Sequence, residues 1–215
     1  MHAHYNSAMF LLPQWLKLGG PITWLLLLVS AVALAVFIER LLHYHRAQIN
    51  SAEFLNGVRT VLKRENVVEA LSICEATPGP VPRLVKTAIL NHERGREGVR
   101  EALEEAGLLE VPRLEEKLSV IATIAQIAPL MGLFGTVLGF LRIFEEIQSA
   151  GINIQRQRLA EGVWEALICT ALGLAVAIPC YAGYNYLVGR VNSIVLDMEK
   201  ASSDILNIVA HKPQP

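Results

Sequence analysis

Three long runs without a charged side chain constrain this fold more than any other feature of the sequence. They cover residues 18–38, 118–141 and 166–189. Each run is longer than the roughly 20 apolar residues that cross the hydrocarbon core of a bilayer at helical rise. The sequence therefore predicts an all-α membrane protein with three transmembrane helices.

The composition supports this class and argues against several others. Hydrophobic residues make up 53% of the chain and charged residues 18%, with a formal net charge of −1. No basic face stands out, so we expect no nucleic-acid partner. The three cysteines, Cys74, Cys169 and Cys180, suggest no disulfide framework. We expect no metal site and no cofactor.

Lysine and arginine residues beside the three runs predict the orientation, because basic residues favour the cytoplasmic side. Most of the 19 basic residues fall in residues 43–117 or near the C-terminus. The predicted segments are a periplasmic N-terminus (1–17), transmembrane helix 1 (18–42), a cytoplasmic helical domain (43–117), transmembrane helix 2 (118–144), a periplasmic loop (145–161), transmembrane helix 3 (162–189), and a cytoplasmic C-terminal helix and tail (190–215).

The cytoplasmic domain has the pattern of amphipathic helices. Asn66 with Glu69 three residues later is typical of a helix N-terminus. The prolines of residues 77–82 should break a helix, and Pro112 suits the first turn of a new one. We expect this last helix and the third span to extend beyond the membrane into the cytoplasm. No residues here have catalytic spacing, so no enzymatic activity is expected.

Small residues recur at spacings of three and four in the second and third spans. In lipid, such residues let helices approach closely. The predicted packing positions are Gly132, Gly135, Gly139, Ala166, Gly173 and Ala177. They fit packing within one chain as well as packing between copies. Pro129 and Pro179 are candidate kinks within these two spans.

Glu165 is the ionisable residue nearest the start of the third uncharged run. One interpretation places it in the first turn of a helix at headgroup level, where the helix dipole favours an acid. The other makes it a proton-binding group within the membrane, where burial favours the neutral acid. Thr136 and Thr170 either bond a carbonyl one turn back or line a polar pathway with Glu165.

Two stretches resemble the signature spans of the MotA/TolQ/ExbB proton-channel family, most closely ExbB. They are IAQIAPLMGLFGTVLGF (124–140) and GVWEALICTALGLAVAIPCYAGYN (162–185). Three further segments also look like those of short ExbB homologues: FIERLLHYHRAQI, PGPVPRL and EEAGLLEVPRLEEKL. By this resemblance, Glu165 corresponds to the family's third-span glutamate, and Thr136 and Thr170 correspond to its two lumen threonines. Trp164 stands where the family has a small residue.

This resemblance implies a ring-shaped homo-oligomer, a pentamer, in the bacterial inner membrane. Its partners would be an ExbD-like single-span protein and a TonB-like protein. The expected function is an ExbB-type subunit of an energy transducer, driven by the proton-motive force, that powers TonB-dependent outer-membrane transport. A TolQ-type motor of envelope maintenance is the alternative with the same span motifs. A self-sufficient secondary transporter and a non-conducting membrane scaffold are alternatives of a different class.

Overall fold

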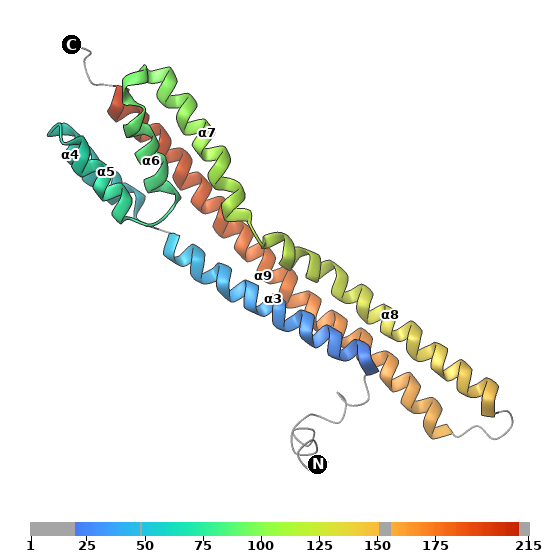
Figure 1. Ribbon diagram of the computed structural model, residues 1–215. Coiled ribbons are helices and arrows are strands. Elements are labelled where there is room, and N and C mark those ends of the chain that lie inside the picture. The colour runs from blue at the N-terminus through green and yellow to red at the C-terminus, as the bar shows by residue number, and fades with distance from the viewer. Residues whose placement is uncertain (1–19, 48, 151–155, 211–215) are drawn as a thin grey trace, which may run out of the picture. The chain divides into compact units, whose positions relative to one another are not determined.

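The computed structural model describes residues 20–47, 49–150 and 156–210, and all their regular structure is helical (Figure 1). The predicted N-terminus 1–17 and part of the predicted loop 145–161 lie outside these residues. The elements in order are α3 (Gly20–Ala47), α4 (Ser51–Lys63), α5 (Val67–Ala76), α6 (Pro80–Leu90), the 3₁₀ turn η1 (His92–Arg94), α7 (Gly95–Glu115), α8 (Leu118–Ala150) and α9 (Arg156–Ala210).

The described residues divide into two compact units. The apolar unit consists of residues 20–37, 119–150 and 156–184, and the polar unit of residues 38–47, 49–118 and 185–210. Helices α3 and α9 each contribute residues to both units, because neither helix is interrupted at the boundary.

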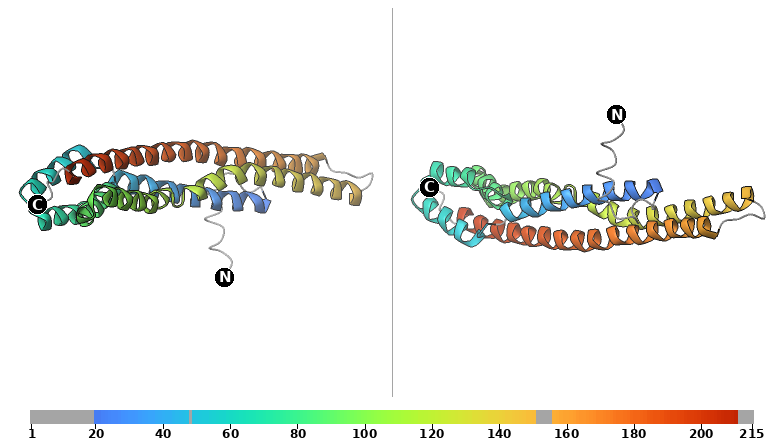
Figure 2. Two further views of the ribbon diagram at one scale, coloured as in Figure 1. Left: turned by 90° about the horizontal axis from the view of Figure 1, so that it is seen from above. Right: turned by 90° about the horizontal axis from the view of Figure 1, so that it is seen from below.

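The apolar unit contains parts of α3, α8 and α9, which lie side by side (Figure 2). These three helices are long and apolar enough to cross a membrane, which confirms the predicted all-α class with three candidate spans. Leu26, Ala128, Val176 and Ala177 form its buried centre. Many large apolar side chains elsewhere are exposed, as expected where lipid is the solvent.

Backbone contact between α8 and α9 depends on their glycines. A β-carbon on Gly132 would lie 2.8 Å from the carbonyl oxygen of Cys169, and one on Gly139 would lie 2.9 Å from the β-carbon of Ala166. A methyl group at either position would push the two backbones apart. The helices therefore approach closely where the sequence has small residues.

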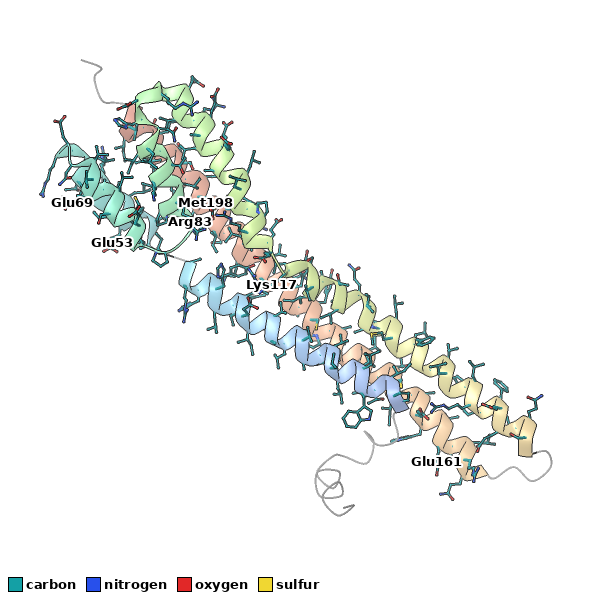
Figure 3. All side chains as sticks on the ribbon, viewed as in Figure 1. Glu53, Glu69, Arg83, Lys117, Glu161 and Met198 are labelled. Carbon is teal, nitrogen blue, oxygen red and sulfur yellow. The ribbon has the colours of Figure 1, made fainter. Side chains whose placement is uncertain are left out.

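The polar unit is built from α4–α7 together with the ends of α3 and α9. Sequential helices pack on one another, from α4 against α5 to α6 against α7. Asn66 accepts a hydrogen bond from the backbone N–H of Glu69 at 3.2 Å, which confirms the predicted N-terminus of α5. Asn50 and Glu53 make the same cap on α4 (Figure 3 labels both glutamates). Each cap satisfies an N–H that has no partner within its helix.

The two predicted breaks have different outcomes. The break at residues 77–82 is confirmed, because α5 ends at Ala76 and α6 begins at Pro80. The prediction that Pro112 opens a new helix is wrong, because Pro112 lies inside α7. The chain breaks later, at Lys117, whose φ of 64° is in the left-handed region. A tertiary contact accompanies that conformation: Lys117 Nζ donates to Glu39 Oε1 at 2.5 Å.

The C-terminal part of α9 supplies one side of the polar unit's core. Val191, Ile194, Met198 and Ile205 are all buried. Their spacing of three, four and seven residues places them on one helix face. This confirms that the helix of the third span continues well past Arg190.

Candidate functional site

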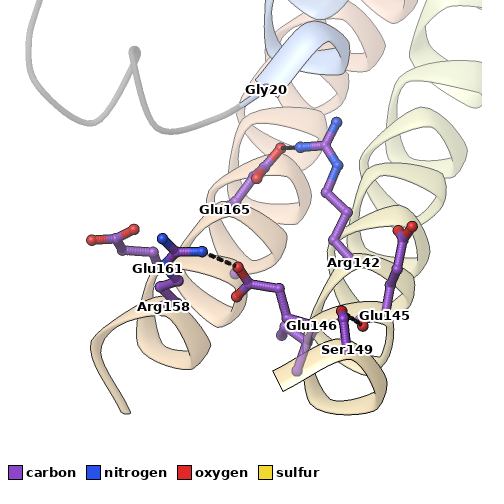
Figure 4. Close-up of a pocket in the computed structure, with 10 residues that line it drawn as sticks. Gly20, Arg142, Glu145, Glu146, Ser149, Arg158, Glu161 and Glu165 are labelled. Atoms are coloured by element: carbon purple, nitrogen blue, oxygen red, sulfur yellow. Dashed lines mark hydrogen bonds and ion pairs between the residues drawn. The ribbon is translucent and has the colours of Figure 1, made fainter. Parts of the chain in front are cut away.

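The last turns of α8, the first turns of α9 and the start of α3 line an open, charged pocket of about 840 Å³ (Figure 4). Its lining combines acidic and basic side chains with two glycines. The lining residues are Gly20, Arg142, Ile143, Glu145, Glu146, Ser149, Arg158, Glu161, Gly162 and Glu165. All of them belong to the apolar unit, so the charges gather at one end of three helices that are otherwise apolar.

Glu165 lies at the inner edge of this pocket, next to the uncharged run. Helix α9 begins at Arg156, which places Glu165 in its third turn. The interpretation of Glu165 as a first-turn acid held by the helix dipole is therefore wrong, since that effect fades within the first turn.

The Glu165 carboxylate lies between α8 and α3. Its Oε1 accepts a hydrogen bond from Arg142 Nη1 at 2.7 Å, and its side chain is 20% exposed. At the start of α3, a β-carbon on Gly20 would overlap the same oxygen. Gly20 also has a φ of +65°, so both the backbone conformation and the close approach require glycine.

The other charged groups of the pocket have contacts of their own. Arg158 Nη1 donates to Glu146 Oε1 at 3.0 Å. Glu161 accepts a hydrogen bond of 3.5 Å from the side chain of Gln157. Arg142 is thus the cation that binds Glu165, whereas Arg158 binds a different acid.

Thr136 and Thr170 meet between α8 and α9, farther from the charged end. Their hydroxyl groups hydrogen-bond to each other. Thr136 Oγ1 also lies 3.1 Å from the carbonyl oxygens of Gly132, one turn back, and of Ala166 on the facing helix. Because a hydroxyl carries one proton, a consistent arrangement has Thr170 donating to Thr136 and Thr136 donating to a carbonyl. Whether the pair lines a proton pathway stays a prediction.

The predicted packing and kink positions lie on the same two helices. Gly132, Gly135, Gly139, Ala166, Gly173 and Ala177 are all buried. Gly135 faces Cys169, and Gly173 faces the backbone of Ala128 and Gly132. Helices α8 and α9 continue through Pro129 and Pro179.

Sequence reasoning did not single out Arg142 or Gly20. A signal for Arg142 exists in the register of the two helices. If Gly132 faces Gly173 and Gly139 faces Ala166, the next turn of α8 brings Arg142 beside Glu165. In the part of the chain that the structure describes, no three His, Cys, Asp or Glu side chains converge as metal ligands would.

The fold and the pocket define a helical membrane protein with three candidate spans and an acid–base pair between two of them. The model of the MotA/TolQ/ExbB proton channel family matches residues 76–200, which is more than half of the chain. The chain belongs to this family.

Relatives named ExbB match along most of the chain. A biopolymer transport protein ExbB homolog of Methanothermobacter thermautotrophicus is 29% identical over 188 residues, covering 86% of this chain and 66% of its own. An ExbB-like biopolymer transport protein of Synechocystis is 31% identical, covering 95% of this chain and 84% of its own. The Tol-Pal system protein TolQ of Haemophilus influenzae is 41% identical, but over 46% of this chain and 43% of its own. Within the family the chain is thus close to ExbB.

Proposed function

We propose that this chain is an ExbB-type subunit of an energy transducer driven by the proton-motive force. With an ExbD-like single-span partner and a TonB-like protein, it powers transport through the outer membrane. The chain resides in the inner membrane with a periplasmic N-terminus, and residues 43–117 and 190–215 face the cytoplasm. It assembles as a ring of identical copies, for which the family suggests a pentamer. It acts through protons rather than as an enzyme.

The observation that carries this proposal is the position of Glu165. Its partly exposed carboxylate lies at the charged end of α8 and α9, and the Thr136–Thr170 hydroxyl pair lies farther along the same two helices. Beyond them the two helices are apolar, so one carboxylate cannot conduct protons across roughly 30 Å of hydrocarbon. A second subunit or water must supply the rest, which fits a transducer that works with a partner.

Replacing Glu165 by Gln tests the role of its carboxylate with little change in shape. In a strain that lacks its own subunit, the variant should insert into the membrane normally but fail to support energy-dependent uptake. Glu161→Gln is the matched control, because Glu161 is exposed, lines the same pocket and lies one turn away on α9. Full uptake with Glu165→Gln would refute the proposal.

A TolQ-type role is the second candidate, favoured by the 41% identity to TolQ over 100 residues. Complementation separates the two. A TolQ-type subunit would restore envelope integrity in a strain without TolQ, measured as resistance to detergent, and would leave outer-membrane uptake unrestored in a strain without ExbB. We expect the opposite pattern.

Proton flux into liposomes separates the transducer from the alternatives of a different class. We expect flux when the chain is reconstituted with its single-span partner and none with the chain alone. Flux from the chain alone would instead indicate a transporter. The absence of flux in both preparations would indicate a non-conducting scaffold.

A further inference from the structure

We propose that Arg142 is a positioning residue for Glu165: it holds the carboxylate at the inner edge of the pocket as an anion until a competing positive charge or a proton releases it. This inference deepens the proposed function, on which it rests for its meaning in energy transduction. It assigns a role to a residue that lies just outside the uncharged run 118–141.

The contact between the two residues is close and comes from two different helices. Arg142 Nη1 lies 2.7 Å from Glu165 Oε1, a normal length for a charge-assisted hydrogen bond. Arg142 lies on α8 and Glu165 on α9, so the contact fixes the carboxylate relative to a second span. The Arg142 side chain is 55% exposed and the Glu165 side chain 20% exposed. The acid is therefore held against the protein, whereas the cation remains accessible from the pocket.

A second feature holds the carboxylate in the same place. Gly20 begins α3, and a side chain there would overlap Glu165 Oε1. The positive end of the α3 dipole consequently lies next to the carboxylate and attracts its negative charge. Glu165 thus lies between two positive features, the Arg142 guanidinium and the N-terminus of α3.

The remaining charges of the pocket do not substitute for Arg142. Arg158 is bound to Glu146 at 3.0 Å and lies on the same helix as Glu165, so it does not tie the acid to another span. Glu145, Glu146 and Glu161 also line the pocket, and their negative charges oppose a second anion there. Without Arg142, Glu165 would therefore lose its cation while these acids remain around it.

This balance gives the pair a means of release. An arginine stays charged at any physiological pH, so the acid is the member of the pair that changes its charge. Protonation of Glu165 removes the attraction and frees both side chains. Arg142, accessible from the pocket, is then available to another anion. In the proposed transducer, the exchange would link proton binding at Glu165 to a change of partner at Arg142.

The test measures how readily Glu165 is modified by dicyclohexylcarbodiimide, a reagent that attacks neutral carboxylic acids in membrane proteins. Native membranes containing the full chain are treated at one pH, and the modified Glu165 peptide is quantified by mass spectrometry. Arg142→Gln should raise the labelling rate about tenfold. This is the low end of the change that one neighbouring charge makes in the ratio of neutral acid to carboxylate. Arg142→Lys, which keeps the charge, should return the rate to near the wild-type value.

Arg158→Gln is the matched control, because it removes the same charge from the same pocket without touching Glu165. Its labelling rate should stay within about twofold of wild type. An unchanged rate in Arg142→Gln, or an equal rise in both variants, would overturn the inference. The labelling rate does not depend on uptake. A failure of this inference can therefore be distinguished from a failure of the proposed function, which the Glu165→Gln complementation tests.

Discussion

The α-carbon of Gly132 lies 2.9 Å from the point that a β-carbon on Gly173 would occupy. The two glycines belong to α8 and α9, and each has the other's backbone as its neighbour. Neither backbone can move away cheaply, because the same two helices also meet at Gly139 and Ala166.

Substitution of Gly173 by Val should therefore destabilise the pairing of α8 and α9. Forcing extra methyl groups into a packed contact costs about 1–3 kcal/mol. Thermal unfolding in detergent, followed by circular dichroism, measures the effect. Gly189→Val is the control on the same helix, because a β-carbon at Gly189 meets no atom within 4 Å. Equal melting temperatures for the two variants would show that the contact is not formed.

The Thr136–Thr170 pair should behave as one energetic unit. Thr136→Val and Thr170→Val each keep the side-chain shape but remove a hydroxyl, at about 1 kcal/mol per lost hydrogen bond. Because the two hydroxyls bond to each other, the double variant should lose less stability than the two single losses combined. The same melting experiment measures this coupling.

Thr123→Val is the control for the threonine pair. Thr123 lies on the same helix, is exposed, and donates a hydrogen bond of 2.7 Å to the carbonyl of Ser119 one turn back. Its substitution should change stability by less than about 0.5 kcal/mol and should show no coupling to Thr170. Strict additivity of Thr136→Val and Thr170→Val would contradict the hydroxyl contact.

In the polar unit, removing both arginines around Glu110 should be more harmful than removing the acid. The Glu110 side chain is 8% exposed and accepts from Arg83 at 2.9 Å and from Arg113 at 2.6 Å. The double variant Arg83→Gln/Arg113→Gln leaves a buried carboxylate without a cation, at a cost of about 3 kcal/mol. Glu110→Gln leaves two arginines that already reach solvent, so its cost should be about 1 kcal/mol.

Hydrogen exchange of the α6 and α7 amides reports these losses locally, because Arg83 lies on α6 whereas Glu110 and Arg113 lie on α7. Arg100→Gln is the control, since Arg100 binds the exposed Glu104 on the surface of α7. Exposed pairs of this kind contribute little to stability, so exchange in this variant should stay close to that of the wild type. Faster exchange in Glu110→Gln than in the double arginine variant would reverse the expected order.

Cys74 should resist alkylation in the folded protein. Burial raises the pKa of its thiol from 9.0 to about 11, with nearby Lys86 acting in the opposite direction. At pH 8 such a thiol is only about 0.1% thiolate, the form that reacts. Iodoacetamide labelling, quantified by mass spectrometry, should rise about tenfold for each pH unit between 8 and 10.

An exposed thiol provides the comparison for Cys74. Ser203 is exposed on α9, so Ser203→Cys should react at least about a hundredfold faster at pH 8 and level off near pH 9. Equal rates for the two cysteines would mean that Cys74 is not buried.

Features set by local chemistry were predictable from the sequence. Asn66 caps α5 because its side chain bonds an amide three residues away, and the three prolines and the glycine of residues 77–82 separate α5 from α6. The three spans follow from composition and length alone. Pro112 shows the limit of this reasoning. A proline fits a first turn, yet α7 accommodates it, and the chain breaks at Lys117, where no glycine or proline marks a turn.

Features set by contact between spans were harder to predict. Glu165 was identified as a candidate, but its position in the third turn depends on α9 starting at Arg156, where no strong cap stands in the sequence. The Arg142–Glu165 contact requires the register of α8 against α9. That register follows from which glycines face each other, and the spacing of small residues alone permits packing between copies as well.

The antiparallel register of α8 and α9 also determines where this chain can change in length. Their contacts form a series that runs from Gly132 and Gly173 through Arg142 and Glu165 to Glu146 and Arg158. One residue inserted into either helix between two of these contacts would rotate every later contact residue of that helix about 100° away from its partner. An insertion beyond the last contact would leave all of them intact. Within these two helices, insertions and deletions should therefore be tolerated only beyond the last contact, in the segment of the chain that joins α8 to α9.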